Sequence, residues 1–400
     1  MRLLLLDESP EVIGGVDTYR RAFAPEAAKL AETVVWACSA ERRRREPHLF
    51  AAPGVTMVDL PPDRRSWQGL VWAALRRIPP KMAPWRANAQ QWLSHSHLRK
   101  VCRRHRLTHV LELCVNHQPF PRLRRPTAGV VHDLSFFTRD DPSIEAALRS
   151  WTKDAVKMFC DSAQTRADLL GLDASVAPRA EVVLLTSPPV QNPPAGPNPF
   201  ARKEPVFYYP ARTTWHKGHD VILGALAKLA AENQSFHCYF SGHGTDRMFD
   251  DNPSPERDTD DVRLACRKYR EPLSGRVTLL GPQSWATVEQ LFQAANLVVL
   301  PTRFEGFGLP LSEALRRNKP VIASRVPSLE EQVAFFGAEE QARWVPLGDE
   351  AALATALGDF LAGRLRFPEF SPALRERVAA WTWAAVARKV LTELKAAASA

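Results

Sequence analysis

The stretch LVVLPTRFEGFGLPLSEAL, residues 297–315, joins an apolar run to a loop with two glycines and then to a helical pattern. The run LVVL is typical of a buried strand, and Pro310 suits the first turn of the helix that follows. Asn318 tolerates the left-handed conformation that often ends a helix. Strand, glycine loop and helix start together predict an anion site, because unpaired backbone N–H groups point at the ligand there.

Two glutamates flank this loop: Glu305 stands before Gly306 and Gly308, and Glu313 lies eight positions after Glu305 in the helical pattern. A carboxylate beside a phosphate repels it, unless the carboxylate accepts hydrogen bonds from hydroxyl groups of the same ligand. We therefore interpret the glutamates as hydroxyl-binding groups on either side of a phosphate cradle, rather than as an acid/base pair. Strand, glycine and helix without the glutamates would indicate an ordinary tight turn.

Similar apolar runs, separated by helical patterns, recur along the whole chain. They cover residues 2–7, 33–39, 55–60, 109–115, 128–134, 157–162 and 181–186 in the first half, and 205–211, 236–242, 276–281, 297–302, 319–324 and 342–347 in the second. Strands without strict alternation that are separated by helices indicate parallel sheets covered on both faces. The sequence therefore predicts an α/β protein with two Rossmann-like sheets.

The domain boundary is marked by residues 187–205, which contain seven prolines and one glycine. Such a segment favours a linker over a regular element. We expect an N-terminal domain over 1–187, a linker over 188–205, a C-terminal domain over 206–370, and a terminal helix over 371–400 that packs back across the domains and is interrupted near 381–383. Ligands of such sheets bind beyond the strand ends, so two facing sheets are expected to form one central cleft.

The composition is that of a globular protein, with 45% hydrophobic and 24% charged residues, but the net charge of +9 is unevenly distributed. Residues 64–106 hold 11 basic residues and no acidic ones, with Trp67, Trp72, Trp85 and Trp92 among them. This stretch favours an anionic partner, either a membrane surface or a lipid-phosphate acceptor. A solvated arginine-rich surface is the alternative; we expect no nucleic-acid partner.

No apolar run approaches the ~20 residues of a membrane span, and the four leucines near the start are too few for a signal peptide. The six cysteines form no C-x-x-C pair. We therefore expect reduced thiols and a cytoplasmic protein, with peripheral binding at the inner face of the plasma membrane as a further hypothesis.

Two basic residues follow the first strand of the second half, Arg212 and Lys217 in PARTTWHKG. Both side chains suit a diphosphate, arginine as a bidentate fork and lysine as a point charge, although two surface cations would show the same spacing. Gly242, in FSGHG after the next strand, is a further glycine-loop residue.

This combination resembles the retaining glycosyltransferases of family four, which have the GT-B fold. The resemblance rests on Arg212 and Lys217 five apart, on Glu305 and Glu313 eight apart, and on the strand order. It covers nearly the whole chain and is strongest over 206–325. Ala211 departs from the glycine that the family usually has before the arginine.

The resemblance implies roles for these residues. Arg212 and Lys217 would bind the donor diphosphate and stabilise it as a leaving group, and Glu305 would hold the transferred sugar. Glu313 would hold the nucleotide ribose. The donor site implied in this way consists of Gly242, Gly306, Phe307, Gly308, Leu309 and Glu313.

In the first half, the resemblance implies that Gly14, Gly15 and Tyr19 form a loop beside the donor phosphate and the acceptor, although an ordinary strand–helix turn would look the same. It also implies that His132, at the end of an apolar strand, touches the donor sugar. Ser162 is expected to cap a helix. The D-x-D at 258–260 is interpreted as a solvated loop, and neither a metal nor another cofactor is required.

The predicted function is transfer of a sugar from a nucleotide diphosphate donor to the hydroxyl of a sugar or lipid-linked sugar acceptor, with retention. Likeness of residues 207–226 to bacterial mannosyltransferases of surface polysaccharides favours GDP-mannose, and leaves UDP-glucose, UDP-N-acetylglucosamine and dTDP-rhamnose open. A nucleotide-sugar epimerase of the same fold and a non-catalytic sugar-nucleotide-binding protein are the alternatives.

Overall fold

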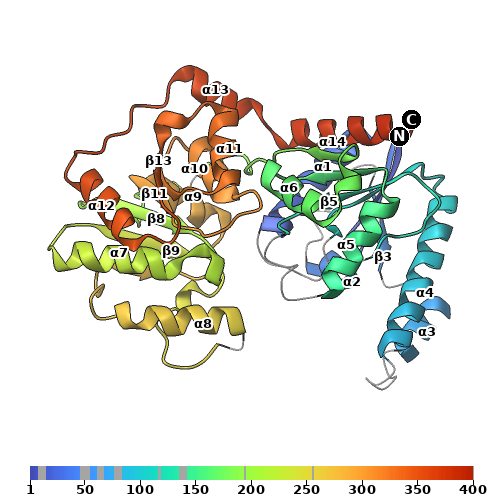
Figure 1. Cartoon of the computed structure of the whole chain (residues 1–400), viewed down its shortest axis with the longest axis horizontal. Coiled ribbons are helices and arrows are strands. Elements are labelled where there is room, and N and C mark those ends of the chain that lie inside the picture. The colour runs from blue at the N-terminus through green and yellow to red at the C-terminus, as the bar shows by residue number, and fades with distance from the viewer. Residues whose placement is uncertain are drawn as a thin grey trace. The chain divides into compact units, whose positions relative to one another are not determined.

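A computed structural model describes residues 1–7, 15–45, 55–60, 67–75, 83–115, 119–134, 142–192, 195–254 and 256–399. The chain divides into two compact units, each of which is described by itself (Figure 1). Unit 1 comprises Met1–Leu185 together with Trp383–Ala400. Unit 2 comprises Thr186–Thr382.

Unit 1 is built on a seven-stranded sheet in the order β3-β2-β1-β4-β5-β6-β7, and every neighbouring pair is parallel. Its strands are β1 (Arg2–Leu6), β2 (Thr33–Cys38), β3 (Val55–Asp59), β4 (His109–Glu112), β5 (Thr127–Val131), β6 (Lys157–Cys160) and β7 (Ala180–Val182). The four leucines of the interior strand β1 are fully buried, as a parallel sheet with helices on both faces requires.

The helices of unit 1 come from both ends of the chain. They are α1 (Gly15–Leu30), α2 (Ala40–Arg45), α3 (Trp67–Leu75), α4 (Ala83–Arg104), α5 (Pro142–Asp154), α6 (Ala163–Leu172) and α14 (Trp383–Ala397). Helix α14 packs against α1, and Figure 1 shows the two side by side. The expected cap is confirmed, since Ser162 Oγ accepts from Thr165 N at 3.1 Å at the start of α6.

Unit 2 has a six-stranded parallel sheet in the order β10-β9-β8-β11-β12-β13. Its strands are β8 (Val206–Pro210), β9 (His237–Ser241), β10 (Val277–Leu279), β11 (Leu297–Leu300), β12 (Val321–Ser324) and β13 (Ala342–Val345). The order changes direction at β8 and β11, so the loops after these two neighbouring strands lie at a topological switch point, where open α/β sheets bind ligands.

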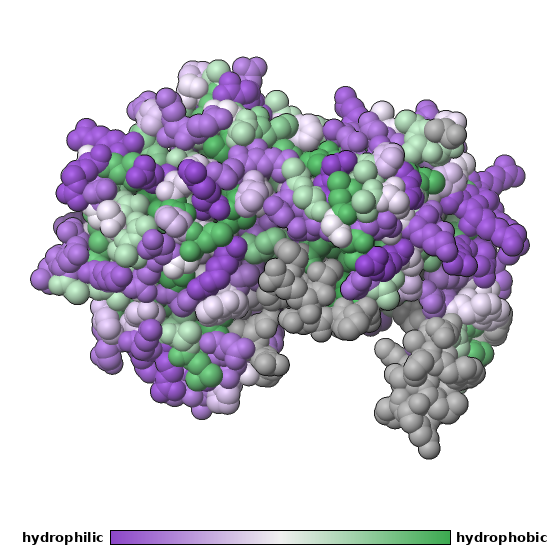
Figure 2. All heavy atoms as spheres, viewed as in Figure 1, coloured by the Kyte–Doolittle hydropathy of each residue, from purple (hydrophilic) through white to green (hydrophobic). Residues whose placement is uncertain are grey.

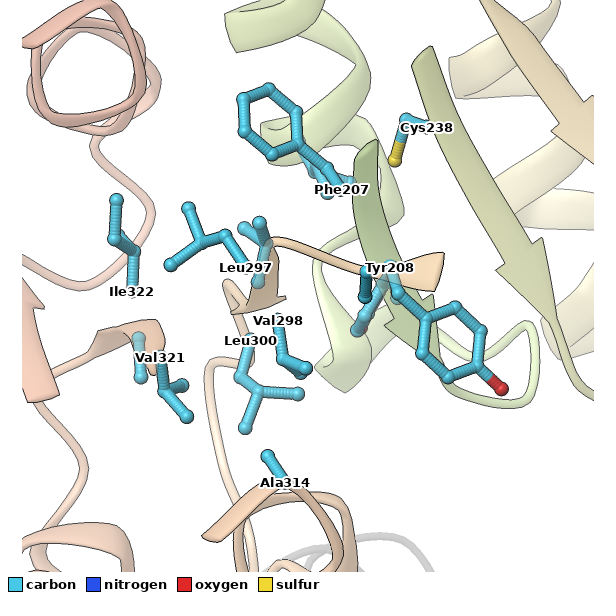
Figure 3. Packing of buried hydrophobic residues seen from close by; sticks show 14 of the residues in the cluster. Phe207, Tyr208, Cys238, Leu297, Val298, Leu300, Ala314, Val321 and Ile322 are labelled. Atoms are coloured by element: carbon cyan, nitrogen blue, oxygen red, sulfur yellow. The ribbon is translucent and has the colours of Figure 1, made fainter. Parts of the chain in front are cut away.

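The helices of unit 2 are α7 (His219–Ala231), α8 (Arg257–Cys266), α9 (Trp285–Ala294), α10 (Leu309–Arg316), α11 (Pro327–Phe336), α12 (Glu350–Leu361) and α13 (Pro372–Ala380). Short 3-10 turns lie at Trp215–Lys217, Thr245–Arg247, Arg267–Tyr269 and Glu339–Gln341. Figure 3 shows part of the core of unit 2. Phe207, Leu297 and Ile322, from three adjacent strands, pack there and have no exposed surface.

All thirteen strands predicted from the apolar runs are confirmed, and both sheets are parallel as expected. The reason is that a strand buried on both faces needs an apolar side chain at nearly every position, which is a strong signal in a sequence. The predicted interruption of the last helix is also confirmed, because α13 ends at Ala380 and α14 begins at Trp383.

The proline-rich segment forms no helix or strand over its described residues, 187–192 and 195–205. It is nevertheless bound along unit 2. Gln191 N donates to Glu289 Oε1 at 3.1 Å, and Asn198 Nδ2 donates to Gln290 O at 2.8 Å, both on α9. The segment is thus attached to one unit along much of its length.

One prediction about local structure is wrong. The polar stretch around the D-x-D at 258–260, interpreted as a loop, forms the start of α8. Thr259 and Val262 of this helix are buried, and Asp260 Oδ1 accepts from Arg263 Nε at 2.8 Å and from Ser254 N at 2.8 Å. Asp260 therefore stabilises the first turn of α8 by accepting these two hydrogen bonds.

No helix among the described residues is long and apolar enough to cross a membrane. The basic stretch 64–106 is described in part, since 64–66 and 76–82 and the side chains of Trp67, Trp72 and Trp85 lie outside the described residues. Its end is clear: Lys100, Arg103 and Arg104 are exposed on α4, and Figure 2 shows hydrophilic side chains gathered there.

Candidate active site

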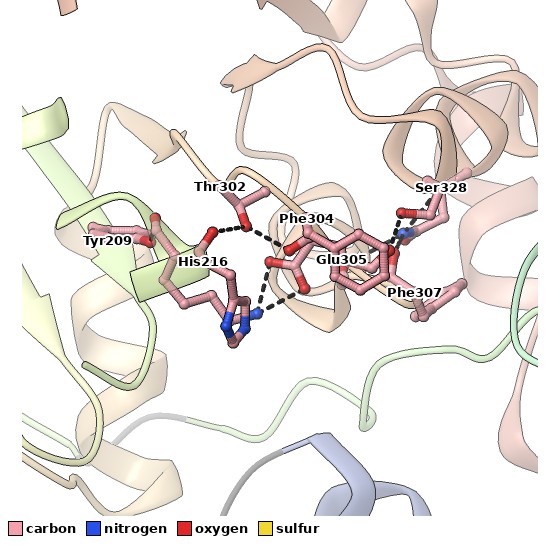
Figure 4. Close-up of polar contacts among 10 residues, drawn as sticks. Tyr209, His216, Thr302, Phe304, Glu305, Phe307 and Ser328 are labelled. Carbon is pink, nitrogen blue, oxygen red and sulfur yellow. Dashed lines mark hydrogen bonds and ion pairs between the residues drawn. The ribbon is translucent and has the colours of Figure 1, made fainter. Parts of the chain in front are cut away.

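The turn after β8 carries Lys217, and the loop after β11 carries Glu305. Lys217 Nζ lies 2.7 Å from both carboxylate oxygens of Glu305, and both side chains are largely buried (Figure 4). The parallel strands β8 and β11 are neighbours, so their carboxyl ends bring the two loops together. The sequence predicted both residues as site residues; their ion pair is a finding of the structure.

Contacts from residues 301–303 join the two loops. Arg303 N donates to His216 O at 2.7 Å, Arg303 Nη1 donates to Trp215 O at 3.0 Å, and the guanidinium lies 4.1 Å from the centre of the Trp215 ring. The same guanidinium forks onto Asp220 at 2.9 and 2.7 Å. These contacts determine the conformation of the turn that presents Lys217.

Gly218 explains how close the loops come. Its φ is +70°, and a Cβ placed there would lie 2.2 Å from Pro301 O. A side chain at this position would therefore push the two loops apart.

The loop between Glu305 and α10 turns its carbonyl groups toward α11. Ser328 Oγ donates to Glu305 O at 2.8 Å, and Gln332 Nε2 donates to Phe307 O (Figure 4 labels Ser328 and Phe307). Within the part of the chain that the structure describes, the backbone N–H groups of Gly306, Phe307 and Gly308 donate to no protein atom. Three unpaired amides at the start of a helix form a cradle for an anion.

Of the two loop glycines, Gly308 has the left-handed conformation, with φ of +89°, directly before Leu309 begins α10. Gly306 is not among the described glycines with positive φ. A Cβ on Gly308 would lie 2.3 Å from Leu329 Cδ2, so this glycine is required by both its φ and the space around it. The expected left-handed Asn318 at the end of α10 is confirmed, with φ of +54°.

Glu313 lies in the second turn of α10 and is buried. Its carboxylate makes no hydrogen bond or ion pair with the described residues, because the nearby Arg317 forks onto Glu289 instead. Burial raises the pKa of Glu313 above its usual value; Arg317 counteracts this effect and Glu289 adds to it. A buried carboxylate without a protein donor is suited to accept hydrogen bonds from a ligand diol.

Arg212 and Gly242 lie at the ends of β8 and β9. The backbone segments are in close contact, since a Cβ on Gly242, whose φ is +135°, would lie 2.4 Å from Ala211 O. Burial, together with the charges of Lys217 and Arg212, lowers the pKa of His216 to about 2. Both predicted cations thus lie near one neutral imidazole in unit 2.

In unit 1, His132 follows β5 and is buried. Its Nε2 lies 3.0 Å from Leu113 O and its Nδ1 lies 3.4 Å from Asp161 Oδ2. Tyr19, on α1, is also buried, and its ring lies 4.8 Å from that of His132 and 5.7 Å from that of Trp383. Burial raises the pKa of the Tyr19 hydroxyl well above its usual range, and Cys114 and Asp161 add to the effect.

Gly15 is the first residue of α1 and is exposed, whereas Gly14 lies outside the described residues. The acceptor loop that we expected around these glycines thus stays a prediction. Within the described ranges, no three His, Cys, Asp or Glu side chains are arranged to hold a metal ion.

Sequence reasoning missed the residues that support the site, namely Asp220, Glu289, Arg303, Arg317, Ser328 and Gln332. They act on backbone carbonyls or on one another across long sequence separations, and no local motif identifies them. The one sequence signal for any of them was the pair of basic residues at 316–317, which follows an apolar helical face and includes Arg317.

Residues 195–378, most of unit 2, match the model of the family described as glycosyl transferases group 1. A D-inositol 3-phosphate glycosyltransferase of Mycobacterium avium (strain 104) is 36% identical over 170 residues, which are 41% of this chain and 34% of that protein. The match therefore spans about a third of that relative's length.

Solved structures match over nearly the whole chain. A sucrose-phosphate synthase from Thermosynechococcus elongatus has a TM-score of 0.71 at 19% identity, with 98% of both chains covered. HepE from Anabaena, in complex with UDP and glucose, has a TM-score of 0.69 at 14% identity, with 99% of this chain and 100% of that chain covered. At such identities the likeness shows the fold, and the predicted GT-B fold class is confirmed.

Proposed function

We propose that this chain is a retaining hexosyltransferase that moves a sugar from a nucleoside diphosphate donor to an acceptor hydroxyl. The observation that carries the proposal is one site in unit 2. Lys217 pairs with Glu305, and among the described residues neither the amides of Gly306–Gly308 nor the carboxylate of Glu313 has a partner. The match to glycosyl transferases group 1 supports it independently.

Each group has one task in the reaction. The amides of the loop and the cations Lys217 and Arg212 bind the diphosphate, and Glu313 accepts from the ribose hydroxyls. When the bond from the anomeric carbon to the phosphate oxygen breaks, the electron pair and the growing negative charge go to the diphosphate. Preorganised cations and amides stabilise this charge more in the transition state than in the ground state.

Retention follows if the acceptor oxygen attacks the face that the diphosphate leaves. The acceptor proton then goes to a departing phosphate oxygen, and Glu305 holds a hydroxyl of the transferred sugar through an oxocarbenium-like state. No step in this scheme uses a metal or another cofactor. The part that His132 takes at the donor sugar stays a prediction from the resemblance.

We propose GDP-mannose as the donor on the likeness of residues 207–226, with surface-polysaccharide or lipid-linked glycan synthesis as the setting. UDP-glucose is the second candidate, because the Anabaena protein of the same fold was solved with UDP and glucose. The acceptor class is a sugar, a lipid-linked sugar or, by likeness to the inositol phosphate enzyme, a phosphorylated polyol.

The proposal is tested with a panel of GDP, UDP and dTDP and their sugars. Thermal shift identifies which nucleotides bind, and turnover, with the anomeric configuration of the product determined by NMR, identifies the reaction. We expect one nucleotide family to stabilise the protein and to yield a product with the donor's anomeric configuration. Lys217→Ala and Glu305→Gln should each lower kcat/KM by about 100-fold or more, since each removes a group at the leaving diphosphate or the sugar.

Lys228→Ala is the matched control. Lys228 is an exposed lysine toward the end of α7, and it pairs with Glu350 of α12. Turnover without any acceptor would instead indicate an epimerase, and unchanged transfer by Glu305→Ala would indicate that the site only binds.

The exposed basic residues at the end of α4 support the proposal that the protein binds an anionic partner at the inner face of the plasma membrane. Burial, together with the nearby charges of Arg99 and Arg122, lowers the pKa of His95 on this helix to about 4. Trp92, on the same helix, is 59% exposed. Co-sedimentation with vesicles should therefore increase with their content of anionic lipid; equal binding to neutral vesicles contradicts this part of the proposal.

A further inference from the structure

The chain passes between the two units twice, between Leu185 and Thr186 and again between Thr382 and Trp383. Both crossings begin or end in unit 2 beside one side chain, that of Arg316, the last residue of α10. Arg316 binds residues of both crossing segments, Thr186 in the first and Trp381 in the second, although the two segments are almost 200 positions apart in the sequence.

The contacts are specific. Arg316 Nε donates to Ser187 Oγ at 2.9 Å, and Arg316 Nη2 donates to Thr186 Oγ1 at 2.8 Å and to Trp381 O at 2.7 Å. Thr186 Oγ1 in turn donates to Trp381 O at 2.7 Å. The planar guanidinium donates in fixed directions, so it holds the two segments in one geometry in a way that a lysine cannot.

The same short helix carries the donor site at its other end. Gly308 precedes α10, Glu313 lies in its second turn, and Arg316 follows Glu313 by three residues. The adjacent Arg317 forks onto Glu289, which also accepts from Gln191 N of the linker at 3.1 Å. A helix of eight residues is about 12 Å long, so a shift of its start moves its end as well.

We propose that Arg316 is a positioning residue that couples donor binding on α10 to both crossings between the units; the proposal rests on the proposed function. Groups that bind the start of α10 and Glu313 select one position of this helix. Through Arg316, that position sets the path of Thr186–Ser187 and of Trp381, and therefore the direction in which the chain leaves unit 2. A merely structural clamp would hold these segments equally with and without donor.

The experiment compares wild type with Arg316→Gln, Arg316→Lys and the control Arg364→Gln. The Arg364 side chain is 68% exposed and pairs with Asp359. Hydrogen exchange is measured with and without the nucleotide sugar that the thermal-shift panel selects, over peptides covering 183–190 and 379–386. Steady-state turnover provides kcat and the donor KM separately.

We expect donor to slow exchange at both crossings in wild type and in Arg364→Gln, and to leave it unchanged in Arg316→Gln. In Arg316→Gln, kcat should fall about tenfold with donor KM within about twofold, because the donor groups remain but reacting groups are misplaced. Arg316→Lys should recover part of kcat, since it keeps the charge and one donor direction.

If Arg316→Gln lowers Tm but leaves kcat and the donor-dependent exchange as in wild type, Arg316 is a static clamp and the inference is wrong. If wild type binds no nucleotide sugar, the proposed function itself fails. Should Arg316→Gln not fold, Thr186→Val and Ser187→Ala remove the acceptors from one crossing instead; full donor-dependent protection in both variants contradicts the coupling.

Discussion

Glu313 is a buried carboxylate that the fold holds at a cost to stability. Burial raises its pKa above the ordinary value, so folding is opposed once the pH exceeds that ordinary value, where the carboxylate of the unfolded chain ionises. This destabilising contribution is absent below the ordinary pKa of the unfolded chain, grows as the pH rises from there to the raised folded pKa, and is constant above it. A residue chosen for stability at this position would be neutral.

We therefore predict that Glu313→Gln raises the Tm of the ligand-free protein at pH 7 and weakens nucleotide-sugar binding. In wild type, binding should weaken about tenfold as the pH falls through the raised pKa of Glu313, because the protonated acid no longer acts as a charged acceptor for the ribose. Calorimetric titrations between pH 5 and pH 8 measure this.

Glu350→Gln, at an exposed surface pair, is the control and should keep the wild-type pH dependence. If Glu313→Gln keeps it as well, another group titrates and the ribose role of Glu313 is wrong.

Gly308, unlike Glu313, is a residue whose identity the local backbone demands. We predict that Gly308→Ala costs about 2–4 kcal/mol, from the left-handed φ together with overpacking against Leu329. Gly275→Ala is the matched control, because Gly275 has φ of +73° but no heavy atom within 4 Å of the added Cβ. It should cost about 1–2 kcal/mol. Urea unfolding of both variants measures the difference; equal costs would show that the contact with Leu329 relaxes freely.

At the scale of elements, the site depends on two loops that follow adjacent strands. The turn Trp215–Lys217 and the loop that ends at Glu305 are held together by Arg303 and Asp220, and α11 holds the carbonyl groups of the second loop. The ion pair of Arg303 with Asp220 is a quarter exposed, so its value lies in geometry more than in stability.

We predict that Asp220→Asn and Arg303→Gln each lower kcat/KM about tenfold, and that the double variant is no worse than Arg303→Gln. The reason is that both changes release the same turn. The exposed pair Lys228 and Glu350, also on unit 2, provides the control cycle and should show effects near zero. Additive losses for Asp220 and Arg303 would mean that the two residues act separately.

Helix α8 shows where sequence patterning fails at this scale. Its buried positions include Thr259 and Arg263 beside Val262 and Cys266, so the apolar stripe expected of an amphipathic helix is broken by polar residues. Arg263 is accommodated because Asp260 and Asp250 O accept from it. The strands, in contrast, were predicted because the interior strands, such as β1 and β11, are buried on both faces and are therefore almost wholly apolar.

At the scale of the whole molecule, the last helix belongs to the first unit. Trp383, Val386, Val390 and Leu394 of α14 are buried, and α14 packs on α1. The chain thus returns to unit 1 after completing unit 2, and unit 1 requires residues from both ends of the sequence for its core.

We predict that Leu394→Ala destabilises unit 1 by about 2–5 kcal/mol, because it truncates a fully buried side chain of α14. Leu264→Ala, at a position 52% exposed on α8, should change stability by less than about 0.5 kcal/mol. Hydrogen exchange resolved by peptide should show faster exchange in β1 and β2 but not in β8 and β11. Equal loss of protection in both units would show that they unfold together.

The sequence by itself determined the two parallel sheets, their thirteen strands, the break before α14 and the residue types of the loop between β11 and α10. It did so because burial on both faces and left-handed glycines impose local requirements that are visible residue by residue. The tertiary structure decided which side chains meet: Lys217 with Glu305, Arg303 with Asp220, and Arg316 with both crossings. These partners lie between 83 and 130 positions apart, apart from the shorter reach to Trp381, so only the packing of strands and helices brings them within hydrogen-bonding distance.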